Sequence, residues 1–455
     1  MGRLIVVSNR VAPVGDEKRN TGGLAVGLLG AMREAGGIWF GWNGQVTTTA
    51  APLARQEKNG ITFATIGLNK RDYRQYYSGF SNATLWPTFH YRIDLARFDR
   101  NEYAGYQRVN AMLADELMTF LQPDDVVWVH DYHLLPFAQA CRKRGALNPI
   151  GFFLHIPFPE PQVVATIPPH QELMRAMLSY DLLGFQTETD RRAFLNTIAQ
   201  QSGVQVHEDG SVHAEGNVTR TGVYPIGVSP GHIAEESAAG RELSRQITRG
   251  VSGDTRKVVV SVDRLDYSKG LVERFCAFDT LLETTPELRH RVQFIQIAPP
   301  SRSDINSYQL IRKQLEAEAG RINGKFSDLD WVPIRYINKS YDRRTLMGLF
   351  RNAQAGFVTP LRDGMNLVAK EYVAAQDPED PGVLVLSRFA GAAQELDGAL
   401  LVNPYDRTGM AEALRTALSM PLDERKARHA GMLQVLKTAD IDAWRNRFLE
   451  DLRRG

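Results

Sequence analysis

With 455 residues, of which 43% are hydrophobic and 23% charged, the chain has a globular composition and is too long for one hydrophobic core. Its 54 lysines and arginines nearly balance its 52 aspartates and glutamates, which excludes the strongly basic surface typical of nucleic-acid-binding proteins. The two cysteines, Cys141 and Cys276, are too few for a disulfide framework or a cysteine-based zinc site.

These features also predict where the protein works. Two reduced thiols fit a reducing compartment, so we expect a cytoplasmic protein. We expect no signal peptide at the start of the sequence and no membrane association, since no apolar run is long enough to cross a bilayer.

Short apolar runs alternate with longer helical patterns along the chain. The expected strands are Leu4–Ser8, Val126–His130, Gly151–His155, Leu182–Gln186, Val223–Ile226, Val258–Val262, Val292–Ala298, Ala355–Val358 and Val383–Leu386. The expected helices include Arg108–Leu121, Pro168–Ser179, Val272–Glu283, Ser307–Ile322 and Ala443–Arg453. Continuous apolar strands that alternate with helices are typical of parallel sheets covered on both faces.

The alternation restarts after about residue 228, which divides the chain. We expect two doubly wound, Rossmann-like α/β domains that face a cleft, residues 1–228 and 229–440. The C-terminal helix, within residues 441–455, is expected to pack back onto the first domain.

Three segments are predicted to lie outside the regular alternation. The polar stretch Gly227–Lys257 marks the domain boundary. Val204–Gly216 contains Asp209-Gly210 between alternating residues, which predicts a surface hairpin. Ala50–Asn59 is predicted to be a surface loop.

The segment from Thr359 to Ala375 carries the strongest indication of function. The apolar run Ala355–Val358 predicts a buried strand, and a helix is expected to begin near Asn366. Asp363 precedes that helix and Glu371 lies within it. Free N–H groups at a helix start favour anions and hydroxyl oxygens, and carboxylates beside them suit sugar hydroxyls. The segment therefore predicts a site for a sugar nucleotide.

Basic residues follow two other expected strands. Arg264 and Lys269 come after Val258–Val262 and could stabilise a leaving nucleoside diphosphate without a metal ion; the alternative is a solvated loop with incidental charges. Arg302 follows a later strand and, together with Arg10, could bind a phosphate.

The first domain offers further candidates that the residues alone leave open. Gly22 and Gly23 would let the backbone approach a phosphate, or would only permit close helix packing. His130, Asp131 and His133 could hold a metal ion, but their spacing matches no zinc pattern, and such groups also position substrate hydroxyls.

Other residues of the chain allow two interpretations. His155 precedes a proline turn, which favours a functional role over a structural one. Tyr76, Tyr77 and Trp86 could form a sugar platform or belong to the core. Asp328-Leu329-Asp330 resembles a metal-binding triplet but is predicted to be a solvated turn, so we expect no metal.

Nine motifs in chain order make the sequence similar to a known family. They are Ser8-Asn-Arg10, Thr21-Gly-Gly23, Trp39-Phe-Gly-Trp42, Asn82-Ala-Thr-Leu-Trp86, His130-Asp-Tyr-His133, Leu154-His-Ile-Pro-Phe-Pro159, Arg264-Leu-Asp-Tyr-Ser-Lys-Gly270, Ala319-Gly-Arg-Ile-Asn323 and Asp363-Gly-Met-Asn-Leu-Val-Ala-Lys-Glu371. Together they resemble the trehalose-6-phosphate synthase family, retaining glycosyltransferases of the GT-B fold, over nearly the whole chain.

The resemblance implies two substrate sites. For the acceptor, glucose 6-phosphate, it implies contacts with Arg10, Tyr77, Trp86, Asp131 and Arg302. For the donor, typically UDP-glucose, it implies Gly22, Gly23, Arg264, Lys269, Phe350, Asp363, Gly364, Met365, Asn366, Leu367, Val368, Ala369, Lys370 and Glu371.

The resemblance also implies a mechanism without a protein nucleophile or a cofactor. The groups nearest the chemistry would be His155, Asp131, Arg264 and Lys269, with Trp86 and Ile156 at positions associated with anomer choice. The residues alone do not exclude an inverting reaction with Asp131 or His155 as base.

Several matters stay open at this level. A related glucosyltransferase or pseudoglycosyltransferase with another phosphorylated acceptor and a non-catalytic sugar-phosphate sensor are the alternatives. The donor base could be uracil, guanine or adenine, and a homo-oligomer is one option for the assembly.

Overall fold

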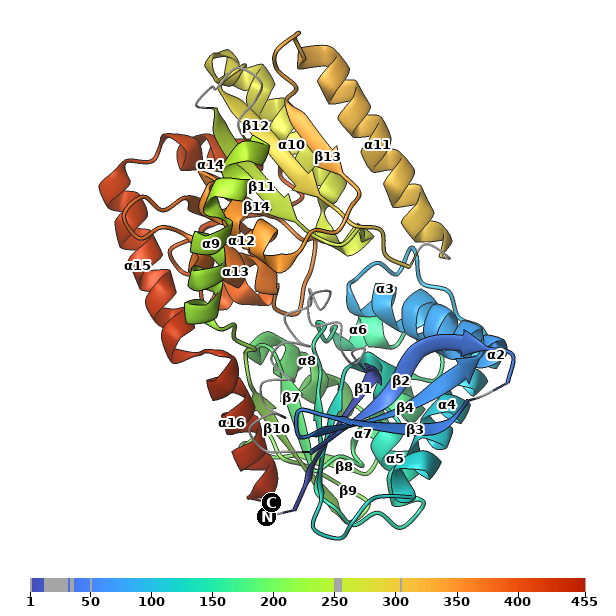
Figure 1. The fold of residues 1–455 in the computed structure, drawn as a ribbon. Helices are drawn as coiled ribbons and strands as arrows, with labels where there is room; N and C mark the ends of the chain where they lie inside the picture. The colour runs from blue at the N-terminus through green and yellow to red at the C-terminus, as the bar shows by residue number, and fades with distance from the viewer. Residues whose placement is uncertain are drawn as a thin grey trace. The chain divides into compact units, whose positions relative to one another are not determined.

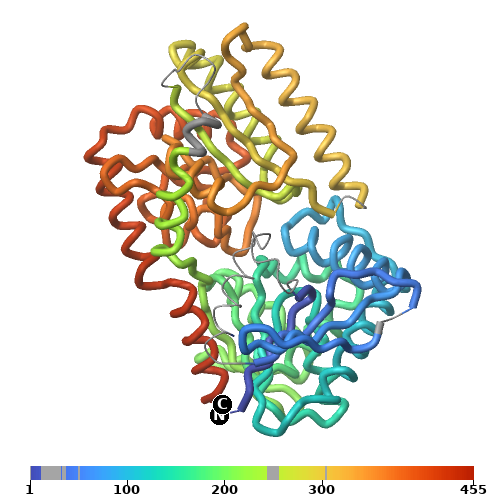
Figure 2. The backbone as a smooth tube through the Cα atoms, viewed as in Figure 1, coloured from blue at the N-terminus to red at the C-terminus, as the bar shows by residue number. Residues whose placement is uncertain are grey.

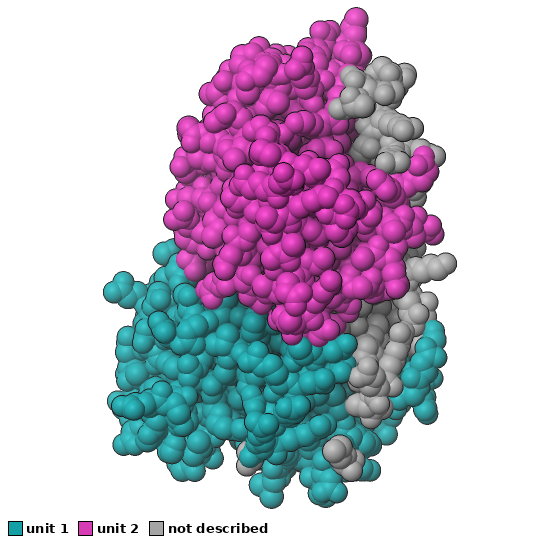
Figure 3. Space-filling model, turned by 90° about the vertical axis from the view of Figure 1, so that its left-hand side faces the viewer, with its two compact units in different colours: residues 1–226, 442–455 teal, residues 227–441 magenta. Residues whose placement is uncertain are grey.

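The computed structural model describes residues 2–11, 32, 37–49, 51–248, 256–302 and 305–454. Two compact units divide the chain, one of residues 1–226 with 442–455 and one of residues 227–441 (Figure 3). No helix in these described ranges is long and apolar enough to cross a membrane.

A ten-stranded sheet organises the first unit (Figure 1). Its strands are β1 (Leu4–Arg10), β2 (Gly37–Thr47), β3 (Ala51–Lys58), β4 (Ile61–Asn69), β5 (Val126–His130), β6 (Ile150–Phe153), β7 (Leu182–Phe185), β8 (Val204–Val206), β9 (Val212–Ala214) and β10 (Asn217–Val223). Their spatial order is β3-β4-β2-β1-β5-β6-β7-β10-β9-β8. In this spatial order, neighbouring strands from β4 through β10 pair in parallel. At the two ends of the sheet, β3, β9 and β8 pair antiparallel with their neighbours.

Helices of varied length accompany these strands. They are α2 (Lys70–Asp72), the π-helix η1 (Tyr73–Leu85), α3 (Trp86–Phe89), α4 (Arg100–Met118), the 3-10 helix η2 (Tyr132–Leu134), α5 (Phe137–Arg142), α6 (Pro161–Val164), α7 (His170–Met177), α8 (Glu188–Ile198) and α16 (Ile441–Arg453). The helix α16, red in the backbone trace of Figure 2, is the last helix of the chain. All of its residues except Ile441 belong to the same unit as β1 (blue).

The second unit has a six-stranded sheet in which every pair is parallel. Its strands are β11 (Lys257–Val262), β12 (Val292–Ile297), β13 (Ile334–Ile337), β14 (Ala355–Val358), β15 (Val383–Ser387) and β16 (Leu400–Val402), in the order β13-β12-β11-β14-β15-β16. The helices are α9 (Pro230–Thr248), η3 (Tyr267–Lys269), α10 (Leu271–Thr284), η4 (Pro286–Leu288), α11 (Asn306–Phe326), α12 (Arg343–Arg351), α13 (Leu367–Ala375), η5 (Gly391–Gln394), α14 (Arg407–Ser419) and α15 (Leu422–Thr438).

Apolar faces of the helices close the core of this second unit. Phe275 and Phe278 of α10 pack against Phe294 of β12, and Leu414 of α14 joins the same cluster. The parallel sheet leaves the carboxyl ends of its strands along one edge, where loops lead into helices, as expected for ligand-binding α/β sheets.

Two sequence predictions about regular structure are wrong. Residues 51–58 form β3, an edge strand whose polar composition follows from its solvent-exposed position. The strand expected at Val223–Ile226 lies earlier, as β10 at 217–223, because Thr219 and its neighbours pair with β9 and β7.

Candidate active site

In the second unit, two backbone hydrogen bonds hold the loop between β14 and α13 in place. The backbone N–H of Asp363 donates to the Phe389 carbonyl at 3.1 Å, and Ala392 N–H donates to the Met365 carbonyl at 2.8 Å. Asn366, with φ of 77°, caps α13 by accepting the Ala369 N–H at 3.1 Å. The turn thus presents the first N–H groups of α13, which have no acceptor within the helix.

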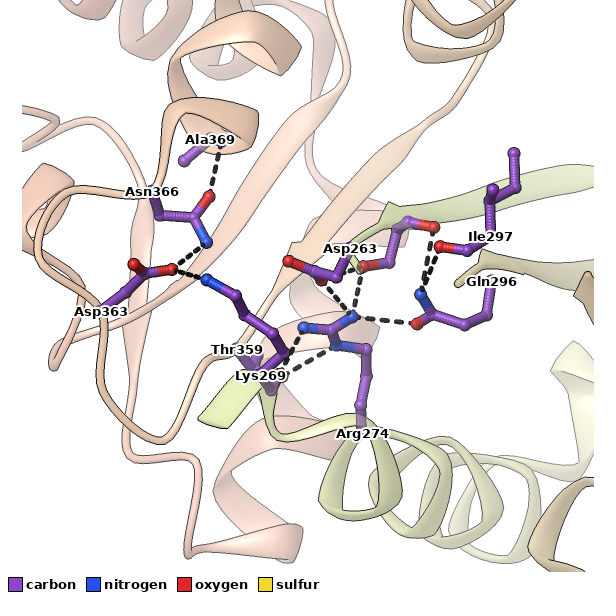
Figure 4. Close-up of polar contacts among 10 residues, drawn as sticks. Asp263, Lys269, Arg274, Gln296, Ile297, Thr359, Asp363, Asn366 and Ala369 are labelled. Carbon is purple, nitrogen blue, oxygen red and sulfur yellow. Dashed lines mark hydrogen bonds and ion pairs between the residues drawn. The ribbon is translucent and has the colours of Figure 1, made fainter. Parts of the chain in front are cut away.

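Asp363 and Lys269 meet at this helix start. Lys269 Nζ lies 2.5 Å from Asp363 Oδ2, and the Asn366 amide donates to the same oxygen at 3.0 Å (Figure 4). Both members of the ion pair are mostly buried, with side-chain exposures of 11% and 13%. The geometry therefore places a cation and a carboxylate together beside free backbone donors.

The loops that carry the two residues are fastened to each other. Leu361 N–H donates to the Ser268 carbonyl at 2.8 Å. Gly270, with φ of 64°, approaches the Thr359 carbonyl so closely that a Cβ atom there would lie 2.2 Å from it. A left-handed conformation and this close approach both require glycine.

Arg274 is a residue that the sequence interpretation missed. It is fully buried and donates to Asp263 at 2.9 Å, to Gln296 Oε1 at 2.9 Å and to the Lys269 carbonyl at 3.0 Å (Figure 4). A further bond to Thr359 Oγ1, at 3.0 Å, ties in β14. Arg274 thereby joins the ends of three neighbouring strands to the Lys269 loop.

The sequence contains a signal for Arg274. Positions 271, 274, 275 and 278 share one face of α10, and the other three members of that face are buried apolar residues. A lone arginine on such a face indicates a buried charge, which requires a partner.

Three of the predicted cations surround Asp266 at the same sheet edge. Burial opposes ionisation of Asp266, but Arg302, Arg264 and Lys269 outweigh it and hold its pKa below the usual value. Arg302 Nη1 lies 3.6 Å from Asp266 Oδ2, and Tyr308 donates to that oxygen at 2.9 Å. The structure therefore brings Arg264, Lys269 and Arg302 together.

Glu371 already has a partner in the protein. Arg343 Nη1 lies 2.8 Å from Glu371 Oε1, and Arg343 Nε lies 2.8 Å from Glu236 Oε2. Burial raises the pKa of Glu371, while Arg343 opposes that rise and Glu236 adds to it. Arg343 has no local sequence signal, because its partners lie on α13 and α9.

Two other predicted donor residues are buried. Phe350 is 1% exposed, and its ring packs edge-on against Tyr372 at 6.0 Å. The Lys370 side chain is fully buried and pairs with Glu395 at 2.6 Å. In this structure Lys370 can therefore offer only its backbone to a ligand, whereas Leu367 and Val368 are partly exposed.

In the first unit, the ends of β5 and β6 join through Asp131. Asp131 has φ of 78°, an uncommon conformation for a residue other than glycine, and its Oδ1 accepts the His155 N–H at 3.2 Å. Its own N–H donates to the Phe153 carbonyl at 2.9 Å. These bonds fix the backbone of His155 against the Asp131 turn.

His130 and His155 share a hydrogen bond. His130 Nδ1 and His155 Nε2 are 3.0 Å apart. Burial, with a smaller effect of His155, lowers the pKa of His130 well below its usual value, and burial lowers the pKa of His155 to about 3. Both rings are neutral at physiological pH, and neither is part of a metal-binding cluster in the residues described.

The aromatic candidates separate into core and surface. Tyr76 and Trp86 are buried, with 1% and 4% exposure, whereas Tyr77 is partly exposed and stacks on His133 with 8° between the rings. Ile156 is also buried. Of these three rings, Tyr77 is the one with exposed surface.

Arg10 is exposed at the end of β1. Its guanidinium lies over Gly44, where a Cβ atom would be 2.8 Å from Arg10 Nε. Arg10 and Arg302, proposed as a phosphate pair from sequence, belong to different units. Gly22 and Gly23 lie outside the described residues, and the Asp328–Asp330 segment forms a turn in which Leu329 is fully exposed.

Known proteins resemble the chain over its whole length. The profile described as glycosyltransferase family 20 matches residues 4–454. A trehalose-6-phosphate synthase from Enterobacter sp. (strain 638) is 54% identical and is covered over 96% of its length by 100% of this chain.

Two solved structures share the fold. A UDP-forming α,α-trehalose-phosphate synthase from Burkholderia xenovorans in complex with glucose 6-phosphate is 57% identical, with a TM-score of 0.95 over 99% of this chain and 100% of that one. A trehalose-6-phosphate structure from E. coli, bound with UDP-2-fluoro glucose, is 52% identical, with a TM-score of 0.94 over 100% and 99%.

Proposed function

The chain belongs to glycosyltransferase family 20, and we propose that it transfers glucose from UDP-glucose to glucose 6-phosphate. The products are α,α-trehalose 6-phosphate and UDP. The observation that carries the proposal is the Lys269–Asp363 pair at the start of α13. A cation suited to a diphosphate and a carboxylate suited to sugar hydroxyls lie together there.

Arg264 and Lys269 are proposed to bind the diphosphate. Negative charge develops on UDP as its bond to glucose breaks, and two fixed cations stabilise that charge. Each charge-assisted hydrogen bond contributes roughly 1.5–3 kcal/mol. The two side chains supply the charge stabilisation that a divalent cation gives in other transferases, so we propose that the reaction needs no metal.

The start of α13 is proposed to hold the glucose and ribose parts of the donor. Asp363 would accept from glucose hydroxyls, and the backbone from Gly364 to Ala369 would contact the donor. Glu371 would accept from ribose hydroxyls while Arg343 keeps its carboxylate charged. The base would lie near Phe350, whose buried ring leaves the backbone as the contacting group.

The acceptor is proposed to meet Arg10, Tyr77 and Asp131, with Arg302 as a further guanidinium for its phosphate. Arg10 is exposed and Tyr77 partly exposed, as ligand-binding groups must be. Trp86 and Ile156 are buried, so their proposed influence on anomer choice would act through the walls of the acceptor site.

Transfer with retention is proposed to proceed on one face of the sugar. The bond from C1 to the UDP oxygen breaks, the bond from C1 to the acceptor oxygen forms, and the departing phosphate oxygen takes the acceptor proton. His155 is a poor general base, since a group with a pKa of about 3 holds a proton too weakly at neutral pH. This favours the leaving phosphate as the proton acceptor.

The reduced, buried cysteines fit a reducing compartment, and we propose that the protein acts in the cytoplasm.

The function is tested by incubating the purified protein with UDP-, GDP- or ADP-glucose and a panel of sugar phosphates. Release of UDP only with glucose 6-phosphate supports the proposal. No release of nucleoside diphosphate from any pair contradicts it, and a preference for another acceptor corrects the substrate.

A further inference from the structure

The buried Arg274 side chain contacts both segments that carry the Lys269–Asp363 ion pair. Its Nη2 donates to the Lys269 carbonyl at 3.0 Å, and its Nε donates to Thr359 Oγ1 at 3.0 Å (Figure 4). Thr359 directly follows β14 and begins the loop that leads to Asp363. One guanidinium group therefore links the backbone of the lysine to the loop of the aspartate.

The remaining nitrogen of this guanidinium is anchored to the sheet. Arg274 Nη1 donates to Asp263 Oδ2 and to Gln296 Oε1, both at 2.9 Å. It also donates to Ser261 Oγ. Ser261 belongs to β11, Asp263 follows that strand, and Gln296 belongs to the neighbouring strand β12. The position of the guanidinium is thus set by two strands of the sheet, and not by the loops that it holds.

Hydrogen bonds hold the peptide groups on both sides of Lys269. The Lys269 N–H donates to the Asp266 carbonyl at 3.1 Å, and the Ser268 carbonyl accepts the Leu361 N–H at 2.8 Å. The Lys269 carbonyl is the next acceptor along the chain, and Arg274 donates to it. Because this carbonyl group and the lysine side chain are attached to the same Cα atom, Arg274 helps to set the direction of the side chain.

Stability alone does not call for an arginine at this position. Arg274 shares its face of α10 with three buried apolar residues, Leu271, Phe275 and Phe278. Replacing a buried ion pair by apolar residues is often neutral or favourable for stability. A guanidinium adds a planar set of donors with fixed directions, which an ammonium group on a flexible chain lacks. The contacts of Arg274 use these directions to join loops that are far apart in sequence.

We propose that Arg274 is a positioning residue that sets the placement of Lys269 relative to Asp363, and with it the spacing of the diphosphate and glucose positions of the donor. The proposal rests on the function given above, in which Lys269 binds the diphosphate and Asp363 the glucose. Arg274 is fully buried, so it acts through these two residues and not by contact with the substrate.

Arg274→Lys is the first test variant. Lysine keeps a positive charge beside Asp263, but its ammonium group lacks the planar fork that reaches the Lys269 carbonyl and Thr359 together. In a crystal structure of the variant without substrate, we expect the Lys269 and Asp363 side chains to lie beyond hydrogen-bond distance. An ion pair that keeps its 2.5 Å contact overturns the proposal. This readout involves no substrate, so its outcome is separate from that of the proposed activity.

UDP binding shows whether Arg274 acts through Lys269. We expect Arg274→Lys to weaken UDP binding, measured by calorimetry, about tenfold, because a displaced Lys269 loses one charge-assisted hydrogen bond to the diphosphate. In a protein that also carries Lys269→Met, the same change should weaken UDP binding by less than about twofold. A tenfold loss in both backgrounds would show that Arg274 acts on the fold and not through Lys269.

Thr359→Val tests the second contact with almost no change in side-chain shape. It removes the hydroxyl group that accepts from Arg274 Nε and leaves the bond to the Lys269 carbonyl in place. We expect kcat/KM for UDP-glucose to fall about fivefold, the cost of one neutral hydrogen bond, and UDP binding to stay unchanged. Wild-type kcat/KM in this variant would contradict the role of Arg274 in placing Asp363.

Phe278→Leu is the matched control. Phe278 lies one turn after Arg274 on α10 and packs against Phe294 with ring centroids 5.4 Å apart, but its side chain carries no polar atom. We expect it to lower the melting temperature and to leave UDP binding unchanged. A loss of UDP affinity equal to that of Arg274→Lys would show that any weakening of α10 disturbs the site, and it would overturn the proposal.

Discussion

Lys269 and Asp363, 94 positions apart in sequence, form an ion pair whose Nζ and Oδ2 atoms are 2.5 Å apart. The two residues come from different loops of one sheet edge, and in the proposed reaction each binds a different part of the donor. A diphosphate that binds Lys269 therefore competes with Asp363 for the same ammonium group. Removing the Asp363 charge should therefore affect the binding of UDP and of UDP-glucose differently.

The first prediction concerns Asp363→Asn. Loss of the carboxylate removes the acceptor for glucose hydroxyls, and we expect kcat/KM for UDP-glucose to fall about ten- to hundredfold, the cost of a charge-assisted hydrogen bond. UDP alone should bind at least as tightly as before, because Lys269 loses its internal counter-charge. Steady-state kinetics and calorimetry measure the two effects.

Asp330→Asn is the control for this prediction, since it removes the same charge from an exposed turn of the same unit. It should leave both quantities unchanged. Parallel weakening of UDP and UDP-glucose binding by Asp363→Asn would show that the residue serves the loop structure instead of the sugar.

The second prediction uses a residue with no functional group. Gly44 has φ of 83°, and a methyl group there would collide with the Arg10 guanidinium. We expect Gly44→Ala to raise KM for glucose 6-phosphate about tenfold, as one charge-assisted bond is lost, with KM for UDP-glucose unchanged.

Gly60→Ala separates displacement of Arg10 from backbone strain. Gly60 has a similar φ of 76°, but nothing lies within 4 Å of its added methyl group. Both variants should lose some stability, and only Gly44→Ala should affect the acceptor. The same acceptor KM in both variants would argue against a role of Arg10 in phosphate binding.

The positions of these groups could be predicted from sequence because parallel sheets place strand ends at one edge. The runs before Asp131, Arg264 and Asp363 are continuous and apolar, and the structure confirms a strand before each. Glycine turns and helix starts follow these strands directly, so each motif lies at the carboxyl end of its own strand.

What the sequence could not predict depends on long-range partners. The polar strand β3 exists because β4 offers it an edge, and its own composition favours a loop. Arg343 becomes part of the site only because α12 brings it to Glu371. His130 packs against Trp444 of α16, which lies more than 300 positions away in sequence.

The third prediction concerns Arg343→Met. Loss of Arg343 leaves Glu371 buried without its counter-charge, which should cost about 3–5 kcal/mol of unfolding free energy at pH 7. The pKa of Glu371 is already raised in the folded state, and this change raises it further. The contribution of Glu371 to the free energy of unfolding is then fully present below its pKa in the unfolded chain. It is lost as the pH rises through the pKa of Glu371 in the folded protein.

The destabilisation should therefore shrink as the pH falls from 7 towards 5, as measured by thermal unfolding. The Arg343→Met, Glu371→Gln double variant should recover most of the loss, while Arg344→Met, an exposed neighbour on α12, should cost little. A loss independent of pH and undiminished in the double variant would contradict the account of this pair.

The fourth prediction concerns the histidine pair and acid. His155 has a pKa of about 3 in the folded state, far below the value of about 6.5 in an unfolded chain. Its contribution to stability is present above pH 6.5 and is lost as the pH falls from there through the folded pKa. We expect His155→Asn to reduce the loss of stability between pH 6.5 and 4.5 by up to about 2 kcal/mol.

Thermal unfolding across that range is the measurement, and His207→Asn, in the exposed hairpin, is the control. Curves of Tm against pH that stay parallel for wild type and His155→Asn would show that His155 is protonated as easily in the folded protein as in the unfolded one.

The central claim is glucose transfer to glucose 6-phosphate with retention at C1. Incubation of the protein with UDP-glucose and glucose 6-phosphate, followed by NMR of the products, tests it most directly. The account predicts UDP and a disaccharide phosphate in equal amounts, with both anomeric carbons in the α configuration. A β linkage at the transferred glucose, or free glucose in place of a disaccharide, would contradict it.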